Sequence, residues 1–310
     1  MESLRSNLAH YLVEIAAYYQ ILNGPTDVHR YKATMNAVEK LKKLSYVPST
    51  SEEAQAIPGI GPSLGATIEA FVQYGSKAKL EELQELAGNI PQYIDMFTKI
   101  YDVGVVTATK FYNEGYRSLD DIPIETLTHA QRLGLKYYNE LNTRIPRDEV
   151  TRMFSGVRKS IGSMVDKLQV VGSYRRGKPT SGDIDILAVS DTETLQDLVD
   201  KLIEDRVVKD VLGLGATMFR GITTRPYRRI DIRLVKQDEY PCALMYFTGS
   251  KDFNTYMRRR AISMYMKLNE YHLYFDYDGS TAEIRVERQI FIALDMEYVS
   301  PKDRVDGFDM

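Results

Sequence analysis

Residues 171–187 read VGSYRRGKPTSGDIDIL, and this stretch decides the fold of the second half of the chain. Acidic and apolar residues alternate at its end, as in a strand with one buried face. Because side chains on a strand alternate between its two faces, we expect Asp183 and Asp185 to share one face, with the isoleucines beside them in the core. Two neighbouring carboxylates repel unless a cation lies between them, and hard oxygen ligands suit Mg²⁺ or Mn²⁺.

A third acid lies in residues 229–234, which read RIDIRL. The same alternation puts Asp231 on a polar face with Arg229 and Arg233. If this strand pairs beside the first, three carboxylates converge and can hold two metal ions about 3.5–4 Å apart, one activating a hydroxyl and one carrying a triphosphate. The alternative is an exposed edge strand with polar alternation. The order of GSYRRG, SGDID and RIDIR along one chain favours the metal site.

The turn that precedes the first two acids has the groups of a phosphate site. Gly172 and Ser173 are expected at a strand-to-helix turn, with Arg176 behind them. Backbone N–H, hydroxyl and guanidinium groups would there face the β and γ phosphates of a nucleotide.

Helical periodicity dominates before Pro146, and strands are expected after it. Apolar residues recur at helical spacing from Leu8 to Ala16, and Asn23-Gly24-Pro25 ends this first run. A second helical stretch is expected over residues 31–44, and a shorter helix at Glu52. The expected strands cover residues 168–172, 183–189, 229–235 and 244–248.

Two short segments in the helical half look alike, namely IPGIGP at 57–62 and IYDVGV at 100–105. Each places a tight turn before a helix-like run, and such a turn exposes N–H groups that suit a phosphate. One copy alone is best explained as an ordinary helical connection. Two copies favour a repeated helix-hairpin-helix on one DNA backbone, although Asp102 replaces Gly59 in the second copy and weakens its phosphate contact.

Composition sets the protein class. A length of 310 residues predicts about two domains, and 44% hydrophobic residues suffice for sizeable cores. No apolar run approaches the roughly 18 residues of a spanning helix, and the N-terminus lacks a secretion signal, so we expect no membrane association. The single cysteine, Cys242, favours a reducing intracellular compartment, with nucleus and cytoplasm left open. The four histidines lie too far apart to indicate a zinc cluster.

The formal net charge of −3 hides strongly charged segments. Residues 144–178 hold nine Lys or Arg against three acids, and residues 217–236 hold six against one. Residues 276–310 hold nine acids against four basic residues. Two basic segments beside the same motifs favour a nucleic-acid partner over a solvated charge run.

In combination, these motifs resemble those of the family X DNA polymerases, and within that family the DNA polymerase beta type. The likeness runs from Tyr31 to Arg304 and includes QRLGLKY at 131–137, RIPR at 144–147, YFTGS at 246–250 and NEY at 269–271. It implies an α+β fold in four parts. These are an N-terminal helical domain with helix-hairpin-helix motifs (1–82), a helical DNA-binding subdomain (83–146), a nucleotidyltransferase-type palm sheet (147–237) and a C-terminal subdomain that closes on the nucleotide (238–310). The length implies a minimal form without BRCT or phosphoesterase domains, of a size that suits a virus.

The resemblance implies a role for each motif residue. Asp183 and Asp185 would bind two Mg²⁺ ions, with Mn²⁺ as a substitute, and Asp231 would bind the catalytic ion beside Arg229 and the primer end. The incoming dNTP and its template partner would contact Arg144, Ser173, Arg176, Gly182, Tyr246, Phe247, Gly249, Asn254 and Arg258. Tyr246 and Phe247 keep the alternative of core aromatics on a strand. Lys251 stands where the beta type has an acid beside the incoming base.

The resemblance also implies sites in the helical half. A monovalent cation, Na⁺ or K⁺, would bridge a DNA phosphate to the backbone carbonyls of Gln55, Ile57, Ile60, Thr98, Ile100 and Val103. Arg30, Ser63 and Lys79 match the pocket for a DNA 5′-phosphate. Thr67 stands where the beta type has the lysine that removes 5′-deoxyribose phosphate, and a hydroxyl cannot form that imine.

The implied function is template-directed addition of dNTPs to a primer 3′-hydroxyl, mainly short-gap filling in base excision repair. The expected enzyme is a monomer that acts on gapped or primer-template DNA, with lyase activity weak or absent. One alternative is a template-independent terminal transferase. The short connection over residues 222–228, after an expected turn at Phe219-x-Gly221, disfavours it because those relatives carry a long loop there. The other is an inactive DNA-binding scaffold, which the three carboxylates disfavour.

Overall fold

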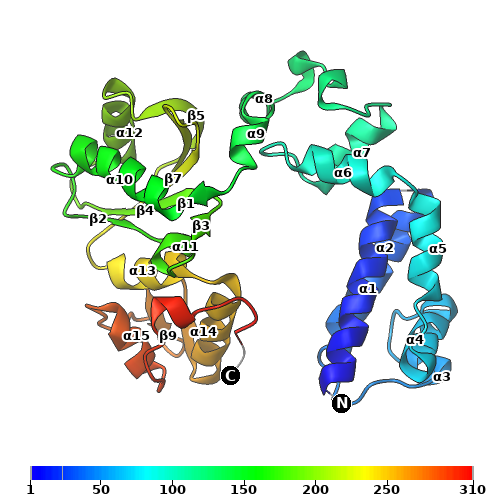
Figure 1. Ribbon diagram of the computed structural model, residues 1–310. Coiled ribbons are helices and arrows are strands. Elements are labelled where there is room, and N and C mark those ends of the chain that lie inside the picture. The colour runs from blue at the N-terminus through cyan, green and yellow to red at the C-terminus, as the bar shows by residue number, and fades with distance from the viewer. Residues whose placement is uncertain (1, 23, 309–310) are drawn as a thin grey trace. The chain divides into compact units, whose positions relative to one another are not determined.

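The structure is a computed structural model that describes residues 2–22 and 24–308, and it divides into two compact units, Met1–Leu127 and Thr128–Met310 (Figure 1). The first unit is helical and the second combines helices with a five-stranded sheet, so the predicted α+β class is confirmed. Within the described residues, none of the helices has the length and apolar character needed to cross a bilayer.

The first unit packs around the long helix α1. Leu8, Leu12 and Ile15 of α1 are buried, as their helical spacing predicted. The second helix begins at Pro25, earlier than the predicted Tyr31, because proline is tolerated in a first helical turn. The helices are α1 Glu2–Leu22, α2 Pro25–Leu41, α3 Ser51–Gln55, α4 Pro62–Tyr74, α5 Ala78–Ala87, α6 Ile90–Thr98 and α7 Val105–Asn113, followed by 3₁₀ turns at Leu119–Asp121 and Ile124–Thr126.

The second unit is built on a sheet with strand order β2-β4-β7-β6-β5, in which only β4 and β7 are parallel. Its strands are β2 Lys167–Val170, β4 Ile184–Val189, β5 Val208–Leu214, β6 Met218–Thr223 and β7 Arg229–Val235, with short pairs β1 Ile145–Pro146 with β3 Thr180–Ser181 and β8 Met266–Leu268 with β9 Leu273–Phe275. Its helices are α8 His129–Lys136, α9 Tyr138–Leu141, α10 Arg147–Ile161, α11 Gly172–Arg175, α12 Leu195–Glu204, α13 Tyr240–Thr248, α14 Lys251–Ser263 and α15 Glu287–Ala293, with a 3₁₀ turn at Pro301–Asp303.

The two faces of the sheet are covered unequally. Ile184, Ile186 and Ile230 belong to one core with α10 and α12. On the other face, Leu187 and Val235 pack against α13 at one end of the strands (Figure 1). The rest of this second face carries the acids of the strand motifs, since those acids alternate with the buried isoleucines.

Two sequence predictions in this unit are wrong. Residues 244–248 form the end of helix α13, not a strand. A short apolar run fits either element, and the deciding signals are Pro241 in the first helical turn and Gly249, at φ +69°, after the last residue.

Phe219-x-Gly221 is the second error, because it lies inside strand β6 and is not a turn. The Phe219 ring lies over Gly221, where an added Cβ would fall 2.3 Å from a ring carbon. The glycine is therefore needed for close packing within the strand. The connection from β6 to β7 is residues 224–228.

Candidate active site

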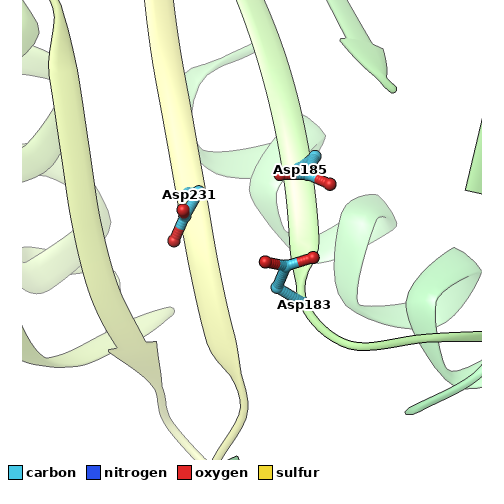
Figure 2. Close-up of side chains that lie close together, drawn as sticks. All are labelled: Asp183, Asp185 and Asp231. Carbon is cyan, nitrogen blue, oxygen red and sulfur yellow. The ribbon is translucent and has the colours of Figure 1, made fainter. Parts of the chain in front are cut away.

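Three carboxylates converge on strands β4 and β7. The parallel register places Asp185 directly opposite Asp231, and Asp183 lies one residue before β4. Figure 2 shows the three side chains on the two adjacent strands. One ligand oxygen from each lies within 4.8 Å of the others. The sequence analysis made the three-carboxylate site depend on pairing between the two motif strands, and β4 and β7 do pair.

The electrostatics of this cluster favour a cation. Burial, and then the negative charge of Asp231, raise the pKa of Asp185 to about 7. Burial also raises the pKa of Asp231, against the opposing effect of Arg229. The buried Oδ1 of Asp231 has no hydrogen-bond partner among the described residues, although Nε of Arg229 lies 3.3 Å from it in an ion pair. Arg229 also pairs with Asp183. Neighbouring, mutually repelling carboxylates whose pKa values are raised by burial fit a divalent cation.

A cavity of about 670 Å³, which we call the catalytic cavity, opens beside Asp183 and Asp185. All nine residues predicted to contact the nucleotide and template line it, namely Arg144, Ser173, Arg176, Gly182, Tyr246, Phe247, Gly249, Asn254 and Arg258. Lys251 and Thr255 of α14 line it as well. Thr255 was not predicted, although its spacing of one helical turn from Lys251 is a signal that could have found it.

The turn at Gly172 brings backbone against a metal-site carboxylate. Gly172 has φ +57°, and a Cβ there would lie 2.1 Å from Oδ2 of Asp185. Only glycine therefore allows the first turn of α11 to approach the acid so closely. Ser173 donates from Oγ to Ser181 Oγ at 2.9 Å.

The opposite wall of the catalytic cavity comes from α13 and α14. Tyr246 and Phe247 are half-buried and meet edge to face with centroids 5.0 Å apart, so they line the cavity and also pack. Asn254 donates to the carbonyl of Tyr246 at 2.7 Å. The Arg258 guanidinium lies 5.0 Å from the Tyr246 ring centroid and 3.9 Å from Glu270.

A buried ion-pair network ties the GSYRRG turn to the C-terminal elements. Arg175 donates both terminal nitrogens to Glu287 at 2.9 Å, and the fully buried Arg304 donates to the same carboxylate at 2.7 Å. Burial opposes ionisation of Glu287, yet these hydrogen bonds lower its pKa. Beside this network, Arg176 donates to the carbonyl of Thr248 at 2.5 Å. The network was not predicted, because Arg175 and Glu287 lie more than 100 residues apart in the sequence.

The two glycine turns of the first unit have the same backbone dihedral angles at the glycine that precedes the helix. Gly61 and Gly104 both have φ −88° and ψ 174°, and each precedes a helix. Gly59 has φ +90° and Asp102, its counterpart, φ +64°. The carbonyls predicted to hold a monovalent cation lie in or just before these turns, where Ile57, Ile60, Ile100 and Val103 are buried and anchor the loops.

The first unit contains a hollow of about 250 Å³, which we call the N-terminal hollow. Arg30, Ser63 and Lys79, the predicted 5′-phosphate residues, all line it, as does Thr67. Thr67 donates from Oγ1 to the carbonyl of Ser63 at 3.0 Å, and Lys79 pairs with Glu82 at 2.8 Å.

Four family models match successive parts of the chain. They are a helix-hairpin-helix domain at 4–77, the fingers domain of DNA polymerase lambda at 95–142, the DNA polymerase beta palm at 144–237 and the DNA polymerase beta thumb at 243–305.

Curated relatives match nearly the whole chain. It is 30% identical to DNA polymerase lambda of Rattus norvegicus over 95% of its own length and 56% of that protein. It is 29% identical to DNA polymerase lambda of Arabidopsis thaliana, covering 97% of the chain and 62% of that protein. It is 25% identical to DNA-directed DNA/RNA polymerase mu of Homo sapiens, covering 86% of the chain and 63% of that protein. The chain therefore spans less than two thirds of the length of these relatives.

Proposed function

The chain belongs to family X of the DNA polymerases, and from this premise we propose that it is a template-directed DNA polymerase that adds dNTPs to a primer 3′-hydroxyl. One observation carries the proposal. The three carboxylates lie beside a cavity whose walls carry Arg144, Ser173 and Arg176, the donors that a triphosphate needs.

The carboxylates of Asp183, Asp185 and Asp231 would hold the divalent cations, which we propose to be two Mg²⁺ ions, with Mn²⁺ as a substitute. When bound, such ions lower the pKa of the primer hydroxyl and neutralise the phosphates. Oδ1 of Asp231, which lies 3.3 Å from Nε of Arg229, would accept the hydroxyl proton. Arg176, held by Thr248, and Ser173 bind and orient the phosphates.

We propose that the four parts of the chain divide the work. Residues 1–82 and 83–146 would hold DNA through the two glycine turns, with Na⁺ or K⁺ at their carbonyls. Residues 147–237 would carry the metal site, and residues 238–310 would select the nucleotide. The shared backbone of the two turns supports the first assignment.

Template dependence is supported by the short β6–β7 connection. Residues 224–228 leave no space for a long loop before Arg229. The test is primer extension with and without a template strand, in Mg²⁺ and in EDTA. Extension that needs both template and Mg²⁺ supports the proposal. Equal extension without template would assign a terminal transferase, and DNA binding without extension would assign a scaffold.

We propose short-gap filling in DNA repair as the biological role, with lyase activity weak or absent. The N-terminal hollow keeps Arg30, Ser63 and Lys79 for a 5′-phosphate, but Thr67 cannot form an imine. Lys79, the lysine lining the hollow among the described residues, has its amine engaged in an ion pair with Glu82 at 2.8 Å. Borohydride trapping on incised abasic DNA tests this, with Lys79→Ala as the variant that removes residual adduct.

We further propose that the enzyme is a monomer in an intracellular, reducing compartment. The thiol of Cys242, the single cysteine, is buried, and burial raises its pKa to about 12, so it is a poor nucleophile for disulfide exchange. Light scattering of the purified chain tests the oligomeric state.

A further inference from the structure

Arg220 lies on the metal-site face of the sheet and has no part in the function described so far. It occupies β6 and is paired directly across from Asp231 of β7. Directly paired residues of neighbouring antiparallel strands project from the same face. Arg220 therefore shares the face that carries Asp185 and Asp231, and Asp231 stands between β4 on one side and β6 on the other.

The guanidinium of Arg220 is available to a ligand. Its side chain is 50% exposed, and its Nε lies 3.8 Å from Oδ2 of Asp231. Among the described residues no hydrogen bond to its guanidinium is formed. A half-exposed ion pair at this distance contributes little to stability, so holding Asp231 in place is a weak reason for this residue.

The surroundings of Arg220 are open. Gly213 of β5 is its neighbour on the far side, and a Cβ there would meet nothing within 4 Å. No side chain at that position covers the guanidinium. Asp231 already faces Arg229 at 3.3 Å, so Arg220 adds a second cation to one carboxylate. An exposed guanidinium whose carboxylate is already shared with Arg229 can bind an anionic ligand.

The sheet order places Arg220 relative to the catalytic cavity. The catalytic cavity lies on the β4 side of Asp231, and Arg220 is not among the residues that line it. Arg220 is thus placed away from the triphosphate, on the β6 side. On the proposed function the primer 3′ end reaches Asp231, and a primer that approaches from the β6 side brings its phosphodiesters past Arg220.

We propose that Arg220 is a primer-strand contact residue that binds a phosphate of the primer's last nucleotides. The inference rests on the proposed polymerase function. It adds a contact that holds the 3′ end beside Asp231, and it predicts that Arg220 contributes to DNA affinity and not to dNTP affinity.

The test is the salt dependence of binding to a one-nucleotide gapped duplex, measured by fluorescence anisotropy from low to high KCl. For Arg220→Met we expect binding about tenfold weaker at low salt and a slope of log K against log salt reduced by about one. Arg220→Lys should keep the slope, because it keeps the charge. The KM for dNTP should stay within about twofold of wild type.

The matched control is Arg206→Met. Arg206 is also exposed, but it borders a different hollow beside Arg152 of α10, and α10 covers the opposite face of the sheet. Arg206→Met should leave the DNA affinity and the slope of log K against log salt unchanged. Unfolding curves of all three variants report whether each is folded.

Three outcomes overturn the inference. The first is an unchanged slope in Arg220→Met with only a lower kcat, which assigns a role in positioning Asp231. The second is an equal loss in Arg206→Met, which assigns a general charge effect. The third is a raised dNTP KM, which places Arg220 in the cavity. Binding needs no turnover, so failure of wild-type primer extension would refute the proposed function separately.

Discussion

The catalytic cavity and the N-terminal hollow are both lined by basic and hydroxyl groups, but they differ in their reactive groups. The catalytic cavity has three carboxylates that the sheet brings within 4.8 Å. The hollow keeps Arg30, Ser63 and Lys79 but has Thr67 where an amine would be needed. If both proposed assignments hold, this chain keeps the phosphate-binding groups of a site without its reactive amine, and phosphate binding is separable from covalent chemistry.

The largest expected effect is at the catalytic cavity. Asp231→Asn should lower the rate of primer extension by about a thousandfold or more, because it removes a carboxylate that no neighbour replaces. DNA binding should change by only a few-fold. Asp200→Asn, at an exposed position of α12, is the control and should retain activity. Near-normal extension by Asp231→Asn would refute the three-carboxylate assignment.

The two sites also differ in the ion pairs that support them. Glu287→Ala should lower the free energy of unfolding by about 3–5 kcal/mol, because it leaves the fully buried Arg304 without its carboxylate. Glu82→Ala, which removes the exposed partner of Lys79, should cost about 0.5 kcal/mol or less. Urea unfolding measures both. Equal losses of unfolding free energy in the two variants would show that the buried network of Glu287 stabilises the protein no more than the exposed Lys79–Glu82 pair does.

The catalytic cavity should make the stability of the protein depend on pH. Burial and Asp231 raise the pKa of Asp185 to about 7, from 3.8 in the unfolded chain. The folded state therefore holds a proton that the unfolded state releases, and stability falls as pH rises from about 4 to 7. In EDTA, Asp185→Asn should be more stable than wild type by up to about 4 kcal/mol at pH 8 and about equal to it at pH 4. A stability difference between Asp185→Asn and wild type that does not change with pH would contradict the raised pKa of Asp185 as its cause.

The smallest predicted effect is a gain in the N-terminal hollow. Thr67→Lys should raise borohydride-trapped adduct on incised abasic DNA by about tenfold, since a primary amine can form the imine. Primer extension should be unchanged. Thr67→Arg is the matched control, because it adds a cation that forms no imine. Equal trapping in wild type and Thr67→Lys would show that the missing amine does not limit the chemistry.

The sequence predicted that three carboxylates converge, because strand alternation is a local pattern. Strand alternation placed Asp183, Asp185 and Asp231, and the only further step was that β4 and β7 pair. The helix at 244–248 was missed because a short apolar run has no period that separates helix from strand. The pairing of Arg175 with Glu287 and of Arg220 with Asp231 depends on long-range packing and register, which no local pattern encodes.

The most direct test of the central claim uses one substrate, a one-nucleotide gap whose downstream strand carries 5′-deoxyribose phosphate. Extension and borohydride trapping are measured on it in the same reaction, with Mg²⁺, beside a template-free primer. We predict extension by the dNTP that pairs with the template, no extension of the free primer, and little trapped adduct. Strong trapping without extension, or equal extension of the free primer, would contradict the account.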